Sequence, residues 1–257
     1  MKILVCLKQV PAKDAALKLD AAGSWIRDDV PYEVNEPDAY ALEAALRQKE
    51  AHGGEVTVLT VGPARAAQVL REALAKGADR AIHVEGEHAP HLDSYACAEA
   101  IARAIPGESY DLFFTGLQSD DYGSAQVGVI LAELLGTPHA TIIMQIEPLA
   151  AGGIRVKREL EGGHFQFVEM PTPAVLTIQS GIDKLRYATL MGIKQAKNKP
   201  LTRISLDEIG APLSLNRVKI ERLRQPQRSR QVQMLGGGAK EAAAALVDKL
   251  RNDARVL

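Results

Sequence analysis

Three segments rich in small or amide-bearing residues follow predicted strands, and they hold the groups best placed for chemistry. These segments are Cys6-Leu7, Val61-Gly62-Pro63 and the run from Gly116 to Gln126. In a parallel sheet they all fall at the carboxyl edge, where ligands bind at the point at which the strand order reverses. Gly116 and Gly123 would permit close backbone approach to a ligand, and Ser124 with the first N–H groups of the following helix would offer an anion site. These features indicate a nucleotide pocket, and an ordinary set of glycine-bearing loops explains them equally well.

Motifs of a known catalytic machinery are missing from the sequence. We find no nucleophile elbow, P-loop, HExxH zinc motif or GxGxxG turn after a strand. His88, His91 and Asp93 are close enough to suggest a metal site, but they lie in a predicted loop, where solvated side chains are the better interpretation. Cys6 and Cys97 are too few for a disulfide framework or a zinc site, and Cys6 is expected to be a small buried hydrophobe. We therefore expect neither catalysis nor a metal site.

The composition is that of an ordinary globular protein with enough residues for a large core. The 257 residues are 46% hydrophobic and 25% charged, with 31 basic residues against 32 acidic ones. This balance argues against a surface built for nucleic acid or anionic membrane, and the 4% aromatic content argues against stacking platforms for single strands. The longest apolar stretch, residues 127–144, contains Glu133, Pro138 and His139, which excludes a membrane-spanning helix. The N-terminus is typical of a strand and not of a secretory signal, so we expect a cytoplasmic protein.

The first two-thirds of the chain alternate strand and helix patterns. Predicted strands cover residues 2–7, 55–61, 80–84 and 111–115, and predicted helices cover 37–49, 64–76, 93–105 and 124–135. Asn35 is expected to cap the first helix. The alternation predicts an α/β fold with a mostly parallel, Rossmann-like sheet and helices on both faces.

The pattern changes after about residue 137. Four short strand-like runs cover residues 140–146, 154–160, 165–169 and 174–178, and glycine pairs stand where hairpin turns would fit. They predict an antiparallel extension of the same sheet in preference to a small appended layer.

Regular patterns fade from Lys184 onward. A basic stretch, relieved only by Glu221, contains Arg217, Lys219, Arg222, Arg224, Arg228 and Arg230. Residues 236–238 are three glycines that predict a hinge, and residues 240–250 predict a final amphipathic helix. A tail with so little core of its own usually wraps a partner, and packing on its own domain is the alternative.

Several segments within residues 1–210 carry a specific resemblance to a known family. They are Lys2-Ile3-Leu4-Val5-Cys6-Leu7-Lys8, Asn35-Glu36-Pro37-Asp38-Ala39-Tyr40-Ala41-Leu42-Glu43, Gly62-Pro63 followed by Ala75-Lys76-Gly77-Ala78-Asp79-Arg80, then Lys157-Arg158-Glu159-Leu160-Glu161-Gly162-Gly163 and Arg186-Tyr187-Ala188-Thr189-Leu190. In this order they resemble the small (beta) subunit of electron transfer flavoprotein.

The resemblance implies a heterodimer whose large (alpha) subunit holds most of a redox-active FAD. The small subunit would supply a supporting domain and would carry a buried AMP with a structural role. The AMP site implied by the resemblance consists of Cys6, Asn35, Glu36, Pro37, Asp38, Val61, Gly116, Leu117, Gln118, Ser119, Asp120, Asp121, Tyr122, Gly123, Ser124, Ala125, Gln126 and Val127. Asn35 and Gln126 are the side chains expected to hydrogen-bond the nucleotide.

The resemblance also implies electron-transfer partners. Flavoprotein dehydrogenases would donate electrons, and a quinone oxidoreductase of the respiratory chain would accept them. Residue 190 matches the family's exposed leucine anchor, and the expected docking residues are Leu190, Met191, Tyr187, Lys194 and Lys197. Lys184, Arg186 and Lys199 complete a cationic collar around this apolar anchor, which is the composition of a transient binding hot spot.

Glu159 resembles a family glutamate near the mobile flavin domain, where it would make a polar contact; an exposed strand end beside a Gly-Gly turn explains it equally well.

From the pattern and the resemblance together we expect a nucleotide-binding domain at residues 1–183, a partner-recognition loop at 184–200, and a C-terminal arm and helix at 201–257 that pack on the large subunit.

Two other functions stay open. Bifurcating members of the family bind a second FAD in place of AMP and use NADH, and the tail of the 120–126 loop resembles theirs, whereas Tyr122 could fill space that a flavin needs. A nucleotide-binding signalling or stress module of similar fold would explain the pocket but not the basic loop or the tail. Nucleic-acid binding through residues 217–230 is disfavoured because that stretch has no aromatic residue.

Overall fold

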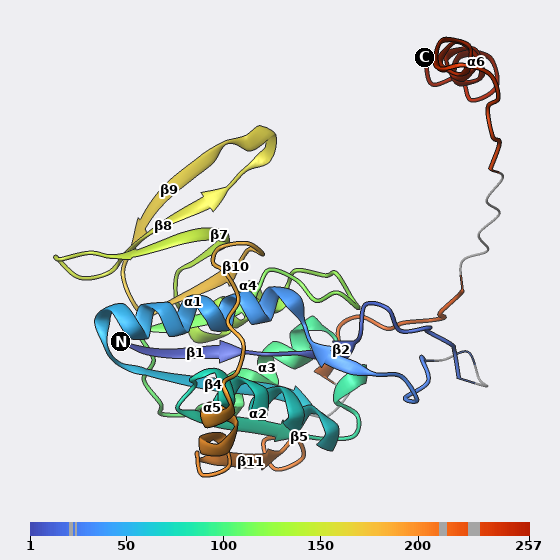
Figure 1. Cartoon of the computed structure of the whole chain (residues 1–257). Helices are drawn as coiled ribbons and strands as arrows, with labels where there is room; N and C mark the ends of the chain where they lie inside the picture. The colour runs from blue at the N-terminus through green and yellow to red at the C-terminus, as the bar shows by residue number, and fades with distance from the viewer. Residues whose placement is uncertain (21–22, 24, 211–214, 226–231) are drawn as a thin grey trace.

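The largest part of the fold is a mostly parallel sheet with helices against both of its faces (Figure 1). This computed structural model describes all residues except 21–22, 24, 211–214 and 226–231. The strands of the main sheet are β1 (Lys2–Cys6), β4 (Glu55–Gly62), β5 (Arg80–Glu85), β6 (Leu112–Gly116), β7 (His139–Pro148), β8 (Ile154–Glu159), β9 (Phe165–Met170), β10 (Ala174–Ile178) and β11 (Leu201–Ser205). The helices are α1 (Glu36–His52), α2 (Ala67–Lys76), α3 (Ser94–Ala104), α4 (Val127–Leu135), α5 (Leu190–Ala196) and α6 (Ala239–Asn252). A hairpin pairs β2 (Gln9–Pro11) with β3 (Tyr32–Val34), and 3₁₀ turns cover η1 (Ala64–Ala66), η2 (Ala89–His91) and η3 (Glu161–Gly163).

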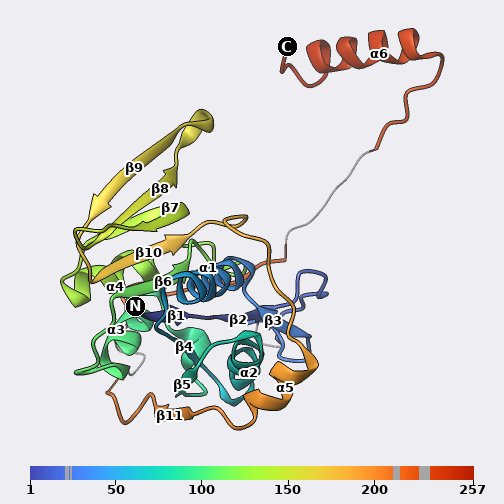
Figure 2. The same cartoon turned by 60° about the vertical axis from the view of Figure 1, so that its left-hand side comes forward.

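The order of the strands decides where a ligand can bind. Among the described residues the main sheet runs β11-β5-β4-β1-β6-β10-β7-β8-β9. Pairing is parallel from β11 to β7 and antiparallel from β7 to β9. The chain moves outward from β1 through β4 to β5 and then returns to place β6 on the other side of β1, so the order reverses beside β1. Because β7, β8 and β9 continue the same sheet, the predicted antiparallel extension is confirmed, and Figure 2 shows β8 and β9 projecting from the body.

Two apolar layers cover the sheet. On one face α1 packs against β1 and α2 packs against β4 and β5, and Leu46 and Leu70 belong to the buried cluster that contains Ile3. On the other face α3 packs against β4 and β5 and α4 packs against β6 and β10, with Leu131 buried in the cluster that contains Leu4. Successive side chains of a strand point to opposite faces, so a strand that is apolar at every position suits a sheet covered on both sides. The predicted α/β fold with helices on both faces is therefore confirmed.

Besides the β2–β3 hairpin, two elements lie where the sequence pattern predicted none. α5 is a seven-residue helix inside the expected docking loop, and β11 pairs in parallel with β5 at the edge of the sheet. A short helix without a buried stripe and an edge strand with exposed Thr202 and Arg203 both give weak periodicity. Leu206 follows β11 and is fully buried against Gly86. Residues 201–206 thus belong to the sheet domain, and the C-terminal arm begins after Leu206 and not at residue 201.

The arm begins on the sheet domain and ends in a helix that buries nothing. The carboxylate of Asp93 accepts the backbone N–H groups of Arg217 and Val218, and the guanidinium of Arg217 lies 4.8 Å from the centre of the Tyr95 ring. Beyond it Lys219, Arg222 and Arg224 are exposed, whereas Arg228 and Arg230 of the predicted basic stretch lie outside the described residues. The predicted final helix is confirmed as α6, which has no buried residue and lies apart from the sheet in Figure 2. None of the described helices combines the length and apolar character needed to cross a membrane.

Replacing Leu206 with Ala in the separately expressed chain should lower the free energy of unfolding by about 2–5 kcal/mol, because a fully buried leucine loses its packing and leaves a cavity. Leu246→Ala in α6 is the matched control, since Leu246 is 48% exposed, and should change the free energy by less than about 0.5 kcal/mol. Urea unfolding followed by circular dichroism measures both. Equal effects of the two substitutions would contradict the boundary after Leu206.

Candidate functional site

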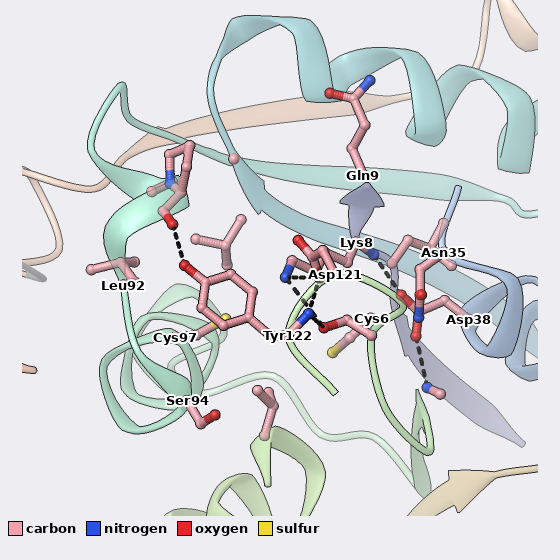
Figure 3. Close-up of a pocket in the computed structure, with 18 of the residues that line it drawn as sticks. Cys6, Lys8, Gln9, Asn35, Asp38, Leu92, Ser94, Cys97, Asp121 and Tyr122 are labelled. Carbon is pink, nitrogen blue, oxygen red and sulfur yellow. Dashed lines mark hydrogen bonds and ion pairs between the residues drawn. The ribbon is translucent and has the colours of Figure 1, made fainter. Parts of the chain in front are cut away.

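A cavity of about 170 Å³ opens at the carboxyl edge of the sheet, beside β1, where the strand order reverses. Its walls come from the ends of β1, β4 and β6, from the 117–128 segment, and from η2 and the start of α3 (Figure 3). Ligands of open α/β sheets bind at such a switch point. The sequence-based expectation that three strand-end segments share one site is therefore met by the geometry.

The buried carboxylate of Asp38 joins the strand ends on either side of this cavity. Asp38 lies in the first turn of α1 and is 6% exposed. Its Oδ2 accepts the N–H of Lys8 at 2.7 Å, directly after β1, and its Oδ1 accepts the N–H of Gly116 at 2.9 Å, at the end of β6. A side chain at Gly116 would overlap Asp38 and the carbonyl carbon of Pro37. Gly116 thus permits the close approach of α1, and it also lines the cavity.

Asn35 shapes the loop that covers the cavity. It is the N-cap residue of α1, as predicted, but its side chain makes no cap hydrogen bond. Its Nδ2 instead donates to the carbonyl of Gln118 at 2.9 Å, and its Oδ1 accepts the N–H of Asp120 at 2.9 Å. Because both ends of the amide bind backbone, Asn35 holds the 118–120 backbone in place beside the cavity.

A clasp of polar and aromatic contacts closes one side of the cavity. Lys8 Nζ lies 2.6 Å from Asp121 Oδ1 and 4.3 Å from the centre of the Tyr122 ring. The Tyr122 hydroxyl donates to the carbonyl of Pro90 at 2.9 Å, which joins the 117–126 loop to η2 (Figure 3). Trp25 packs 5.9 Å from Tyr122 between ring centres. We call these contacts of Lys8, Asp121, Tyr122 and Pro90 the Tyr122 clasp.

The two cysteines line the cavity but are poor nucleophiles. Burial raises the pKa of the Cys97 thiol to about 11, and burial raises the pKa of Cys6 further. Both thiols are therefore protonated near neutral pH, which suits the predicted role of Cys6 as a small buried hydrophobe. Gln9 offers a different kind of group, because its Oε1 is buried and has no hydrogen-bond partner among the described residues.

The helix after the cavity loop starts later than predicted. α4 begins at Val127 and not at Ser124, and its first N–H groups lack intrahelical partners and border the cavity. The Ser124 hydroxyl lies 3.0 Å from the Ser94 hydroxyl, three residues before the helix. Ala125 has φ +53, a left-handed conformation that non-glycine residues rarely adopt outside functional loops. The first turn of α4 at Val127 and Gly128 and the preceding Ser124 all line the cavity.

Most residues of the predicted site line the cavity. These are Cys6, Asn35, Asp38, Val61, Gly116, Leu117, Gln118, Ser119, Asp121, Tyr122, Ser124, Ala125, Gln126 and Val127. The other predicted residues lie outside the lining and have structural partners. Glu36 pairs with Lys13, Pro37 is buried in α1, Asp120 binds Asn35 through its N–H, and Gly123 donates its N–H to Ser119.

Several lining residues were missed by sequence reasoning. Lys8 and Gln9 directly follow β1, so the strand-end argument could have included them. Trp25 reaches the cavity through folding of a distant segment and carries no local signal, whereas Arg65 lies just after the Val61-Gly62-Pro63 segment. Asp93 also borders it, but its carboxylate caps α3 through the N–H of Ala96 and holds the arm, which leaves it a structural residue and not a metal ligand.

The predicted docking residues lie on a separate surface. Tyr187, Leu190 and Met191 are 92%, 88% and 64% exposed, and Lys194 and Lys197 are exposed beside them. Leu190 begins α5, whose N-cap Thr189 accepts the N–H of Gly192 at 3.0 Å. Large apolar side chains this exposed, and adjacent to one another, are typical of interaction sites.

Glu159 ends β8 and is half-buried. Its Oε2 accepts a hydrogen bond from Gln179 Nε2 at 3.3 Å.

Fold and site together define an α/β protein with a ligand cavity at the switch point of a mostly parallel sheet. The profile of the electron transfer flavoprotein domain matches residues 23–209. The chain is similar to the electron transfer flavoprotein subunit beta of Methylophilus methylotrophus, with 39% identity over 96% of this chain and 97% of that protein. It is 32% identical to the subunit beta of Bacillus subtilis (strain 168) over the full length of both, and 35% identical to the caffeyl-CoA reductase-Etf complex subunit CarD of Acetobacterium woodii over 98% of both. The chain belongs to the electron transfer flavoprotein family and matches its beta subunits along nearly its whole length, which confirms the resemblance read from the sequence.

Asp38→Ala should destabilise the chain, and the effect should depend on pH. Burial raises the pKa of Asp38 to about 7, although the N–H groups of Lys8 and Gly116 oppose this shift. Between about pH 4 and pH 7 the folded chain therefore keeps a proton that the unfolded chain releases, so this carboxyl makes the free energy of unfolding fall as the pH rises through that window. At pH 5 the substitution should cost about 1–3 kcal/mol, because buried N–H groups lose their acceptor. The difference in the free energy of unfolding between wild type and Asp38→Ala should shrink toward pH 7. Chemical unfolding at several pH values measures this difference.

Asp111→Ala is the matched control at the opposite end of β1. Asp111 accepts the N–H of Lys2 at 2.7 Å but is exposed, so its loss should cost less than about 0.5 kcal/mol. A flat pH dependence of the difference between wild type and Asp38→Ala would contradict the raised pKa.

Proposed function

We propose that this chain is the beta subunit of a heterodimeric electron transfer flavoprotein that takes electrons from flavoprotein dehydrogenases and passes them to a quinone oxidoreductase. In this proposal the alpha subunit holds most of the FAD, which supplies the redox chemistry, and this chain binds a structural AMP and docks the dehydrogenase. The proposal rests on one observation: in a chain that belongs to this family, a cavity lies where the strand order of the sheet reverses, and its wall is formed by the 117–126 loop and the start of α4.

The cavity offers the groups that an adenine mononucleotide requires. The first N–H groups of α4, at Val127 and Gly128, would hold the phosphate, and Lys8 and Arg65 bring positive charge to the same walls. Gln9 Oε1 is a buried acceptor without a partner among the described residues, and the amino group of adenine could satisfy it. Residues of this chain would thus bind and orient the nucleotide largely through backbone groups.

The Tyr122 clasp supports AMP over a second FAD. The clasp occupies the side of the cavity between the 117–126 loop and η2, where the Tyr122 ring takes space that a second flavin would need. The alternative is a bifurcating beta subunit that binds a second FAD and NADH. It is favoured by the Ala125-Gln126-Val127 sequence and by the similarity to a relative named as part of a caffeyl-CoA reductase-Etf complex.

A signalling or stress module of similar fold is a weaker candidate. The similarity to electron transfer flavoprotein subunits covers the exposed α5 segment and the C-terminal arm, which such a module would not need.

The three predicted regions take defined roles in the proposal. Residues 1–183 together with β11 form the nucleotide-binding domain, residues 184–200 form the docking segment, and the arm after Leu206 packs α6 on the alpha subunit. The support for the arm is its exposed apolar side chains, among them Val232, Met234 and Leu246. Glu159 would contact the flavin-bearing domain from the tip of β8.

The nucleotide can be identified directly. Heterodimer produced with the alpha subunit should release AMP and FAD in equal amounts when it is denatured, and chromatography with mass spectrometry quantifies both. Release of FAD alone, at twice that amount, would favour the bifurcating alternative. A single FAD without any second nucleotide would remove the cavity from the proposal.

Leu190→Ala tests the docking surface. Because Leu190 is exposed, the free energy of unfolding should change by less than about 0.5 kcal/mol. An apolar anchor lost from a binding hot spot should weaken dehydrogenase binding by about 2 kcal/mol, roughly thirtyfold in affinity. Stopped-flow reduction of the heterodimer by the dehydrogenase at subsaturating concentration measures this loss, while reduction by dithionite should be unaffected.

Leu17→Ala is the matched control, since Leu17 is also exposed but lies in the loop between β2 and β3. It should leave both rates unchanged. Wild-type coupling in Leu190→Ala would show that α5 is not the anchor.

A further inference from the structure

The cationic collar expected around Leu190 consists of two different groups of residues. Lys184, Lys194 and Lys197 are exposed, as steering charges must be. Arg186 and Lys199 are half-buried and their charged groups bind the sheet domain on either side of α5. The two groups therefore cannot perform the same task.

Arg186 fastens the chain before α5 to helix α1. Its Nε and Nη2 bind the two carboxylate oxygens of Glu43 at 2.8 and 2.9 Å, and its Nη1 binds Glu50 at 2.6 Å. The backbone N–H of Arg186 also donates to Glu43, at 3.2 Å. Glu43 is 2% exposed, so this planar two-point pairing takes place inside the protein, where lysine could not reproduce it.

Helix α5 itself lies against the end of α2 (Figure 2). A side chain at Gly192 would overlap the carbonyl oxygen of Ala75, so the two helices approach as closely as their backbones allow. The side of α5 that carries Gly192 therefore faces α2, and Leu190 and Met191 remain exposed.

Lys199 fastens the chain after α5 to the last turn of α2. Its Nζ donates to the carbonyl of Leu74 at 2.9 Å and to that of Ala78 at 2.7 Å. These carbonyls belong to a helix C-terminus, which carries partial negative charge and attracts cations. Burial lowers the pKa of Lys199, as expected for an ammonium group withdrawn from water.

We propose that Arg186 and Lys199 are positioning residues that hold α5 on α1 and α2, so that Leu190 and Met191 are presented to the dehydrogenase in a fixed arrangement. Electrostatic steering then belongs to Lys184, Lys194 and Lys197. This inference rests on the proposed docking function. A rigid anchor loses less conformational freedom on binding than a mobile one, and mobility of α5 would therefore weaken docking without changing any contact residue.

The test uses FAD-loaded heterodimer and a purified flavoprotein dehydrogenase that reduces the wild-type heterodimer. Arg186→Lys keeps the charge and loses the two-point pairing. We expect the KM for the heterodimer to rise roughly threefold to tenfold, the effect of ordering about one additional side chain on binding, with kcat and the salt dependence unchanged. Hydrogen exchange of residues 190–196 should become faster, while the FAD content and melting temperature show that the protein is folded.

Two lysines provide a matched pair with the same change of charge. Lys199→Met should speed hydrogen exchange of α5, whereas Lys197→Met should leave exchange unchanged and reduce the salt dependence of the association rate. Unchanged exchange and KM in both Arg186→Lys and Lys199→Met, with a strong loss in Leu190→Ala, would overturn the positioning role and leave the docking function intact. If Leu190→Ala also couples normally, the docking function fails, and the positioning role fails with it.

Discussion

The hydrogen bonds of one buried carboxylate, that of Asp38, hold the functional end of the sheet together. One oxygen accepts the N–H of Gly116, which lies 78 residues from Asp38 in the sequence. The other accepts the N–H of Lys8, which lies 30 residues from Asp38. These are the strand ends that flank the reversal of strand order, where neighbouring loops diverge and leave space. Burying a carboxylate is costly unless its oxygens are satisfied, and here the two backbone N–H groups that satisfy them fix the positions of both strand ends.

Helix α1 connects the cavity with the docking segment through a second buried acid. Asp38 in its first turn fixes the strand ends, and Glu43 farther along the same helix fixes Arg186 at the base of α5. A long helix packed on the sheet is rigid, so the cavity and the docking segment keep fixed positions relative to each other. Under the proposed function, this chain would contribute positioning to electron transfer, with backbone groups that bind a nucleotide and an apolar anchor that binds a partner.

Features that depend on the periodicity of the sequence could be predicted, whereas side-chain contacts between distant segments could not. Buried strands such as residues 2–7 and the glycine-bearing loop after β6 have local signatures, and they predicted both the sheet and the site of the cavity. Asn35 carried a good capping signature, yet its side-chain amide binds the backbone of Gln118 and Asp120 instead of the start of the helix. The same limit applies to Arg186, because a cation in a basic segment gives no sign that a buried glutamate 143 residues away will bind it.

A crystal structure of the heterodimer with the alpha subunit tests the central claim most directly, because it shows what fills the cavity beside β1. The account predicts one adenine mononucleotide, with its phosphate at the start of α4, the Tyr122 clasp closed, and the flavin outside this cavity. A flavin ring inside the cavity with Tyr122 displaced, or a cavity that contains only water, would contradict it.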